Sequence, residues 1–386
     1  MKFLHLGDLH LGRSLGSFEL LEDQKYILEQ ILRIAVEKKA DAILVAGDVY
    51  DRTIPSEAAV ELLNDFLCKV SESGIKVFLI SGNHDSDERL NFGSTLIRRS
   101  GVHIASKYGG QTYRVTAEDE FGEVNFYLLP FMKAAKVRQF HPSDRIESYD
   151  DAAKAVIAHM ELDPKARNVL VAHQYVTGSD GEDPITAGSE VVHEMTVGNV
   201  EKIYASTFRA FDYVALGHIH SPQKLGRETV RYSGSPLKYS LSEVKNEKSV
   251  PLVTMGEKGN VTVELIPLVP KRALRHLTGT VEELLHGREL GNTEDFIYAT
   301  ITEEKKRENY MGIFQQVYPN TVKIDFQREQ ERLPEEMSMN LMGEKKSFGE
   351  LVSDFYKMIY GTDISEEEMK LLREVGREAG VTDETD

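Results

Sequence analysis

The stretch Ala42-Ile43-Leu44-Val45-Ala46-Gly47-Asp48-Val49-Tyr50-Asp51-Arg52 decides the fold. A short apolar run that is stopped by glycine and aspartate predicts a buried parallel strand ending at a ligand, because open α/β sheets bind ligands at the carboxyl ends of their strands. We therefore expect Asp48 to lie at that edge of a sheet.

Four further apolar runs end in residues of the same kinds. The polar residues that follow these runs are Asp8 and His10, then Asn83 and His84, then His173, and finally His218 and His220. Because the carboxyl ends of parallel strands share one edge, residues that are far apart in the sequence can meet in one pocket there. The combination of aspartate, asparagine and histidine indicates a metal site.

The number of these candidate ligands is sufficient for two metal ions. Two divalent cations about 3.5–4 Å apart can activate a water and stabilise both oxygens of a phosphoester displacement. Such a pair needs a carboxylate between the ions, and Asp48 is the best candidate. We expect Asp8, His10 and His220 to complete one site, and Asn83, His173 and His218 to complete the other.

The composition is that of a globular protein with more than one domain. The 386 residues are 41% apolar and 28% charged, and the net charge of −17 disfavours a protein that coats nucleic acid by bulk attraction. Met1 leads directly into a predicted strand, and no apolar run reaches the length of a membrane span, so we expect a cytoplasmic protein without a membrane partner. The single cysteine, Cys68, fits a reducing compartment, and its helical context predicts a buried structural thiol.

The order of patterns along the chain predicts four regions. Strands and helices alternate up to about Ser100, and period-two strands over 102–130 predict a second, more antiparallel sheet. Prolines 267 and 270 place the end of this first domain near residue 270. We expect a small α+β module over 271–328, a charged linker over 329–347, and two amphipathic helices over 348–386 that need a partner surface.

The motifs together resemble the calcineurin-like metallophosphoesterase superfamily. The resemblance rests on Asp8-x-His10, Gly47-Asp48-x-x-Asp51, Gly82-Asn83-His84-Asp85, His173 and Gly217-His218-x-His220. Within the superfamily, the stretch Gly7 to Gly12 and the turn Ser233-Gly234-Ser235-Pro236-Leu237 resemble the SbcD family, the nuclease subunits of bacterial SbcCD complexes. The resemblance implies an α/β fold, a four-layer αββα sandwich with a small α+β capping domain and C-terminal helices.

The same resemblance implies a function. It implies a DNA nuclease that uses two manganese ions, acts on DNA ends and hairpins as exonuclease and endonuclease, and serves DNA repair, recombination and replication. It also implies that His84 stabilises the transition state or protonates the leaving oxygen, a role that suits a histidine near neutral pH. Asp51 stands where archaeal and eukaryotic relatives carry histidine, and we interpret it as the partner of His84 in a catalytic dyad.

Partners follow from the resemblance as expectations. The module at 271–328 would guide DNA, and the candidate phosphate contacts are Arg13, Arg52, Lys271, Arg272, Arg275, Lys305, Lys306, Arg307 and Lys323. The tail helices would dock an SbcC-type ATPase, although packing back onto the module is the alternative. The helices at 56–70 and 87–100 would form a homodimer surface, although packing on the sheet explains their apolar residues equally well.

Two rival interpretations stay open on the sequence. A metallophosphatase or cyclic-nucleotide phosphodiesterase of the same superfamily would carry the same metal motifs, but it would give the module and the tail helices no purpose. A non-catalytic scaffold is disfavoured, because every candidate ligand is present.

Overall fold

The computed structural model describes residues 1–178, 183–186, 202–286, 291–303 and 309–327, together with scattered residues between 349 and 372. The chain divides into two compact units, Met1–Phe326 and Gln327–Asp386. The predicted linker at 329–347 and most of the predicted tail helices lie outside the described residues.

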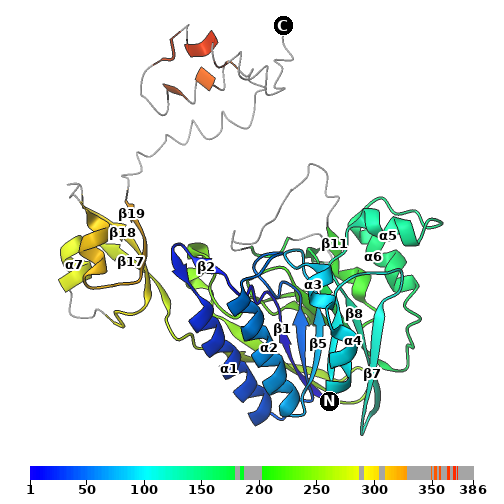
Figure 1. The fold of residues 1–386 in the computed structure, drawn as a ribbon. Helices are drawn as coiled ribbons and strands as arrows, with labels where there is room; N and C mark the ends of the chain where they lie inside the picture. Colours follow the sequence, from blue (N-terminus) through cyan, green and yellow to red (C-terminus); the bar gives the residue numbers. More distant parts are fainter. Residues whose placement is uncertain are drawn as a thin grey trace. The chain divides into compact units, whose positions relative to one another are not determined.

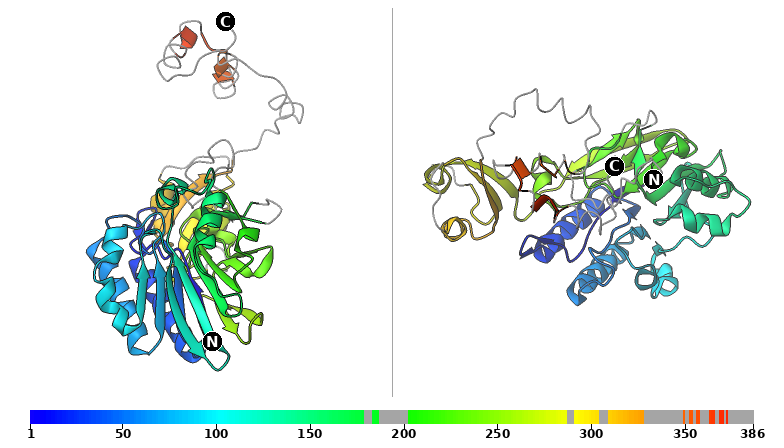
Figure 2. Two further views of the ribbon diagram at one scale, coloured as in Figure 1. Left: turned by 90° about the vertical axis from the view of Figure 1, so that its right-hand side faces the viewer. Right: turned by 90° about the horizontal axis from the view of Figure 1, so that it is seen from above.

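The first unit contains two six-stranded sheets that face each other (Figures 1 and 2). The first sheet, in spatial order, consists of β16 (Val261–Pro267), β15 (Ser249–Met255), β1 (Lys2–Leu6), β4 (Ala42–Ala46), β5 (Lys76–Ile80) and β6 (Val102–Ala105). The second consists of β13 (Gln223–Leu225), β14 (Arg227–Tyr232), β12 (Tyr213–Gly217), β9 (Arg167–His173), β8 (Gly122–Leu129) and β7 (Tyr113–Asp119). Two short pairs, β2 (Ser14–Leu15) with β3 (Phe18–Glu19) and β10 (Val176–Thr177) with β11 (Ile203–Tyr204), lie outside them.

Strand β4 shows how one short sequence serves two cores. All five of its residues are buried. Ile43 and Val45 pack toward the helices, whereas Ala42, Leu44 and Ala46 pack between the two sheets, because successive side chains of a strand point to opposite faces. Because both faces of β4 are covered, every residue of the strand has to be apolar, and the sequence shows a continuous apolar run instead of an alternating one.

Helices cover the outer face of each sheet and give the expected four-layer αββα sandwich. The first sheet is covered by α1 (Leu21–Glu37) and α2 (Glu57–Glu72), whose apolar faces share one core with its outward side chains. The second sheet is covered by α5 (Ala134–Phe140) and α6 (Tyr149–Ala158). Short helical turns complete the layers: α3 (Asp87–Asn91), α4 (Ser94–Ile97), η1 (Arg98–Ser100), η2 (Ala205–Phe208) and η3 (Leu241–Lys245).

The second sheet differs from the expected antiparallel one. Its four central strands, β8, β9, β12 and β14, are mutually parallel, and only the edge strands β7 and β13 pair antiparallel. The strand that follows Gly101, β6, joins the first sheet instead of starting the second. The period-two pattern of the edge hairpin β7–β8 was a poor guide, because the strands that decide the sheet type are the fully buried ones farther along the chain.

A small α+β module follows the sandwich. Its three parallel strands are β17 (Leu274–Gly279), β18 (Phe296–Ile301) and β19 (Thr321–Phe326), and its helices are α7 (Val281–His286) and α8 (Tyr310–Gln315). The helices and one face of the sheet enclose a core of their own, which includes Ile297, Phe314 and Tyr318. Arg272 forms an ion pair with Asp23 of α1 and lies over the Phe296 ring, so this contact attaches the module to the sandwich.

The proposed homodimer helices are only partly as predicted. Helix α2 forms as expected, with Ser56 as its N-cap, but Ala59, Leu63 and Phe66 are buried in the core and are not available to a partner. The expected helix at 87–100 is three separate turns, because Gly93 adopts a left-handed conformation with φ of 72°. The chain in this region exposes Phe92 and Leu96 instead.

Two further predictions concern the environment of the chain. Cys68 is exposed on α2, so the prediction of a buried thiol is wrong; the helical stripe that buries Phe66 and Val70 turns Cys68 away from the sheet. Within the described part of the chain, no helix is both long and apolar enough to cross a membrane.

Candidate metal centre

The predicted ligands converge because the strands that carry them end at the same edges. Strands β1, β4 and β5 lead to Asp8 and His10, Asp48, and Asn83 and His84, while β9 ends at His173 and β12 leads to His218 and His220. Backbone strain is concentrated here. Of the seven non-glycine residues with positive φ in the described chain, four are Asp8, His10, Asp48 and His218. Such conformations persist where a functional arrangement requires them.

Asp48 lies between the two predicted halves of the site. Its Oδ2 atom is 3.6 Å from Nε2 of His10 and 3.4 Å from Nε2 of His173. Its Oδ1 atom accepts a hydrogen bond of 3.0 Å from the backbone N–H of His84, which fixes the carboxylate orientation. One oxygen therefore faces ligands of both halves, which is one of the ways in which a carboxylate can bridge two ions.

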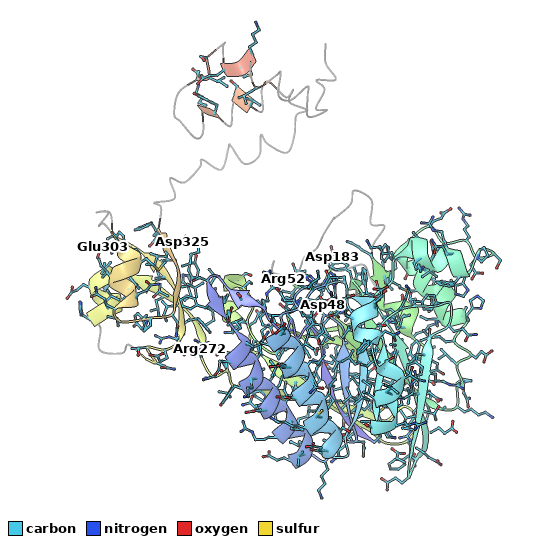
Figure 3. All side chains as sticks on the ribbon, in the orientation of Figure 1. Asp48, Arg52, Asp183, Arg272, Glu303 and Asp325 are labelled. Atoms are coloured by element: carbon cyan, nitrogen blue, oxygen red, sulfur yellow. The ribbon has the colours of Figure 1, made fainter. Side chains whose placement is uncertain are left out.

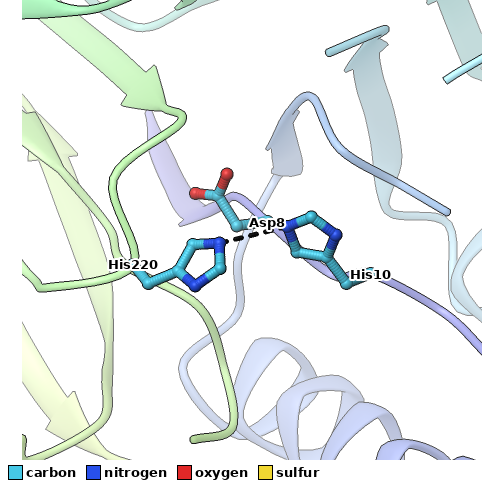
Figure 4. Close-up of side chains that lie close together, drawn as sticks. All are labelled: Asp8, His10 and His220. Carbon is cyan, nitrogen blue, oxygen red and sulfur yellow. Dashed lines mark hydrogen bonds between the residues drawn. The ribbon is translucent and has the colours of Figure 1, made fainter. Parts of the chain in front are cut away.

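Asp8, His10 and His220 form the first half (Figure 4). The Nε2 atoms of His10 and His220 are 3.1 Å apart, and all three residues are buried. Asp8 Oδ1 accepts from the backbone N–H of His218, but Asp8 Oδ2 and His10 Nδ1 are buried without a hydrogen-bond partner. Buried polar atoms are rarely left unpaired, so this cluster fits a bound cation.

Asn83, His173 and His218 form the second half. Asn83 Oδ1 lies 3.0 Å from His173 Nε2 and 3.1 Å from His218 Nδ1. His173 Nδ1 lies 2.8 Å from the carbonyl oxygen of Ala46, and a hydrogen bond donated there directs Nε2 toward Asp48 and Asn83. This is the arrangement by which a metal-ligating histidine is usually oriented.

Burial and the neighbouring charges shift the pKa values of the ionisable side chains in the cluster. Burial raises the pKa of Asp8 to about 6 and, with the neighbouring His173, lowers the pKa of His218 to about 3. Burial opposes a charge on His173, yet the Asp48 carboxylate and Asp8 raise its pKa to about 9. A proton on His173 Nε2 occupies the place that a cation would take, so metal binding has to displace it.

The predicted dyad pairs the Asp51 side chain with His84, but the structure shows a contact through the Asp51 backbone instead. His84 Nδ1 lies 3.1 Å from the backbone carbonyl oxygen of Asp51, not from its carboxylate. The carboxylate accepts a 2.9 Å hydrogen bond from Arg13 and lies 3.6 Å from His10 Nδ1. The loop that follows β4 turns the Asp51 side chain toward these groups, which the sequence spacing alone does not specify.

Two buried carboxylates were not predicted. Asp85 accepts hydrogen bonds from the backbone N–H groups of Val49, Tyr50 and Gly82, and it thereby fastens two of the ligand-bearing loops to each other. Glu243 lies 3.5 Å from His220 Nδ1 and pairs with the buried Lys248. The position of Asp85 directly after Asn83-His84 was a signal for its role, whereas nothing in the sequence distinguishes Glu243.

Glycines allow the two sheets to approach each other at the site. A Cβ atom on Gly47 would lie 2.4 Å from His173 Nδ1, and one on Gly217 would lie 1.8 Å from the carbonyl oxygen of Ala46. Both distances are far below van der Waals contact, so no other residue fits either position without moving a ligand.

The predicted phosphate contacts have different environments. Arg52, which lies near Asp48 (Figure 3), is the most exposed of those beside the site, with 82% of its side chain accessible. Arg13 is held by Asp51. Arg272 is paired with the buried Asp23, so its structural contact replaces the expected exposure to DNA. Ion pairs also engage Lys271 with Glu22, Arg275 with Asp295 and Lys323 with Asp325. Lys305, Lys306 and Arg307 lie outside the described residues.

Comparisons with known proteins show what this chain is similar to. The calcineurin-like phosphoesterase family model matches residues 1–222, and the model described as the type 5 capsule protein repressor C-terminal domain matches residues 270–360. The SbcD subunit of the nuclease SbcCD from Staphylococcus saprophyticus is 33% identical over 328 residues, which are 84% of each chain. A solved dimetal phosphatase from Danio rerio is 10% identical with a TM-score of 0.37, and the match covers 70% of this chain and 96% of that one.

The family matches and the relative extend over both the sandwich and the region that follows it. A phosphodiester hydrolase with nuclease chemistry is consistent with the Asp, Asn and His side chains that the two sheets bring together. The chain belongs to the calcineurin-like phosphoesterase family and, within it, to the SbcD nuclease family.

Proposed function

We propose that this chain is a two-metal, manganese-dependent DNA nuclease that digests duplex ends as an exonuclease and cleaves single strands and hairpins as an endonuclease. The observation that carries the proposal is the position of Asp48 Oδ2, 3.6 Å from His10 Nε2 and 3.4 Å from His173 Nε2. Two divalent cations bound there would activate a water and neutralise the charge that develops on the phosphate.

The residues of the chain take distinct roles in this proposal. One ion would be held by Asp8, His10, Asp48 and His220, and the other by Asp48, Asn83, His173 and His218. His84 would protonate the leaving oxygen or stabilise the transition state. The Asp51 carbonyl oxygen, 3.1 Å from Nδ1, supports this role because a hydrogen bond there turns Nε2 of the same ring away from Asp51.

Partners belong to the same proposal. The name of the Staphylococcus saprophyticus relative describes one component of an SbcCD complex, and we propose that this chain likewise acts with an SbcC-type ATPase in DNA end processing, repair, recombination and replication. The region 348–386 would dock that ATPase, and the module at 271–328 would cap the site. Homodimer formation would use the exposed Phe92 and Leu96, and the cytoplasmic location predicted from the sequence stays a prediction.

The test is digestion of an end-labelled DNA duplex with manganese, beside bis-p-nitrophenyl phosphate as a small diester. We expect duplex cleavage that needs manganese and is lost in His84→Gln. His103→Gln is the matched control, because His103 is also half-buried but bonds Tyr113 away from the centre. Hydrolysis of the small diester with an intact duplex, even when an SbcC-type ATPase is added, would refute the nuclease proposal in favour of a phosphodiesterase.

A further inference from the structure

A third group of potential metal ligands lies outside the metal centre. Ligand atoms of His141, Asp144 and His159 are all within 4.8 Å of one another. His141 caps the end of α5, Asp144 lies in the turn that follows, and His159 caps the end of α6. Both helices cover the outer face of the second sheet (Figure 1), so this group shares no residue or element with the ligands of the metal centre.

The backbone holds the three residues in place. The N–H of Asp144 donates to the carbonyl oxygen of His141 at 3.1 Å, which closes a tight turn between the two ligands. The imidazole rings of His141 and His159 stack with centroids 4.3 Å apart and an interplanar angle of 16°. His159 Nε2 lies 3.1 Å from Asp144 Oδ2. Turning the rings out of this stack would let their nitrogens face one ion together with the Asp144 carboxylate.

Tyr108 prepares His141 as a ligand. The phenol oxygen lies 2.7 Å from His141 Nε2, and the hydroxyl donates to the carbonyl oxygen of Gly110 at 3.2 Å. When the hydroxyl donates to Gly110, it accepts from His141 Nε2–H, and that tautomer leaves the imidazole lone pair on Nδ1. An outer partner that accepts the second ring N–H is the usual companion of a metal-bound histidine.

We propose that His141, Asp144 and His159 bind one Zn²⁺ ion, with water at the remaining position. Two imidazole nitrogens and one carboxylate oxygen suit zinc, which takes four ligands at about 2.0–2.2 Å from N and O atoms. The ion joins the turn after α5 to the end of α6, two points that are 18 residues apart in the sequence, and so stabilises the outer layer of the second sheet. This inference does not depend on the nuclease proposal.

The test counts zinc in the full-length protein by equilibrium dialysis against free Zn²⁺. The variants are His159→Ala and Asp144→Asn, both at positions with partly exposed side chains, and the control is His276→Ala, an exposed histidine on β17 that bonds Thr300. We expect one zinc per chain fewer in both variants, or zinc affinity at this site lowered more than about 10-fold, and no change in the control. Hydrogen exchange of the segment 141–160 should slow on zinc addition in wild type and control only.

The outcome is decisive in both directions, because the metal centre is intact in all four proteins. Equal zinc content in wild type, His159→Ala and Asp144→Asn would overturn the proposal, and the three side chains would then be a hydrogen-bonded cluster only. Hydrogen exchange in 141–160 that does not respond to zinc in the wild type would overturn it as well.

Discussion

Replacing Gly47 by alanine tests whether the close approach of the two sheets sets the geometry of the metal centre. The new Cβ atom would lie 2.4 Å from His173 Nδ1 and 2.9 Å from the Cα atom of Gly82. The first distance is about 1 Å short of ordinary van der Waals contact. His173 must therefore move by about that amount, and its 2.8 Å hydrogen bond to the carbonyl oxygen of Ala46 would be lost.

A displacement of about 1 Å in a positioned catalytic group costs roughly 100-fold in rate. We expect Gly47→Ala to lower kcat/KM for manganese-dependent hydrolysis of bis-p-nitrophenyl phosphate by about that factor. Alanine in the left-handed region also costs about 1–2 kcal/mol of stability, because Gly47 has φ of 83°.

Gly259 provides the matched control. It has the same φ of 83°, but a Cβ atom there meets nothing within 4 Å. Gly259→Ala should therefore lose similar backbone stability in chemical denaturation and keep kcat/KM within about twofold of wild type. The reasoning is refuted if Gly47→Ala retains as much activity as Gly259→Ala in samples that are equally folded.

Other contacts in the molecule lead to four more predictions. Asp51→Asn should leave the pH profile of kcat/KM unchanged, because His84 contacts the backbone carbonyl of this residue; a shifted profile would restore the side-chain dyad. Asp85→Asn should lower the free energy of unfolding in urea by about 2–3 kcal/mol, since an amide cannot accept from three N–H groups as a carboxylate does, and an unchanged midpoint would contradict this role. Arg167 holds the pKa of Asp119 well below its usual range, so the pair stabilises the fold above about pH 4 and this stability is lost as the pH falls further. Asp119→Asn should be about 2 kcal/mol less stable at pH 7, and acid titration followed by circular dichroism should show a smaller loss than in wild type. Manganese at 100 times its Kd should raise the free energy of unfolding by about 2.7 kcal/mol, and thermal melts that are insensitive to manganese and to EDTA would argue against the metal centre.

The strand ends were predictable because their signal is local. Each apolar run is short, buried and ends at a candidate ligand, directly as in β9 and His173 or after a glycine as in β4 and Asp48, so the residue types alone predict both the strand and the chemistry at its end. The parallel edge rule then brings the ends together without any coordinates. Helical patterns were less reliable. Cys68 lies on the exposed side of its helix, and the helix expected over 87–100 is interrupted by the left-handed Gly93.

Side-chain contacts across the site required the tertiary structure. Asp51 offers a carbonyl oxygen to His84 while its carboxylate binds Arg13, and no spacing rule distinguishes these two atoms. Glu243 approaches His220 from a separate segment, and Arg272 is taken up by Asp23, which is 249 positions away. Such pairs depend on how the loops close after the strands have assembled.

The sequence by itself led to the αββα class through its resemblance to a known family, and it predicted the candidate ligands, because burial and ligand chemistry are properties of residue types in a local order. Only the tertiary structure decided which oxygen of Asp48 faces both halves, why Gly47 and Gly217 must lack a Cβ atom, and that His141, Asp144 and His159 meet. The physical reason is that these are distances of a few ångströms between segments far apart in the chain. They are set by the packing of two sheets and their helices, which no local pattern records.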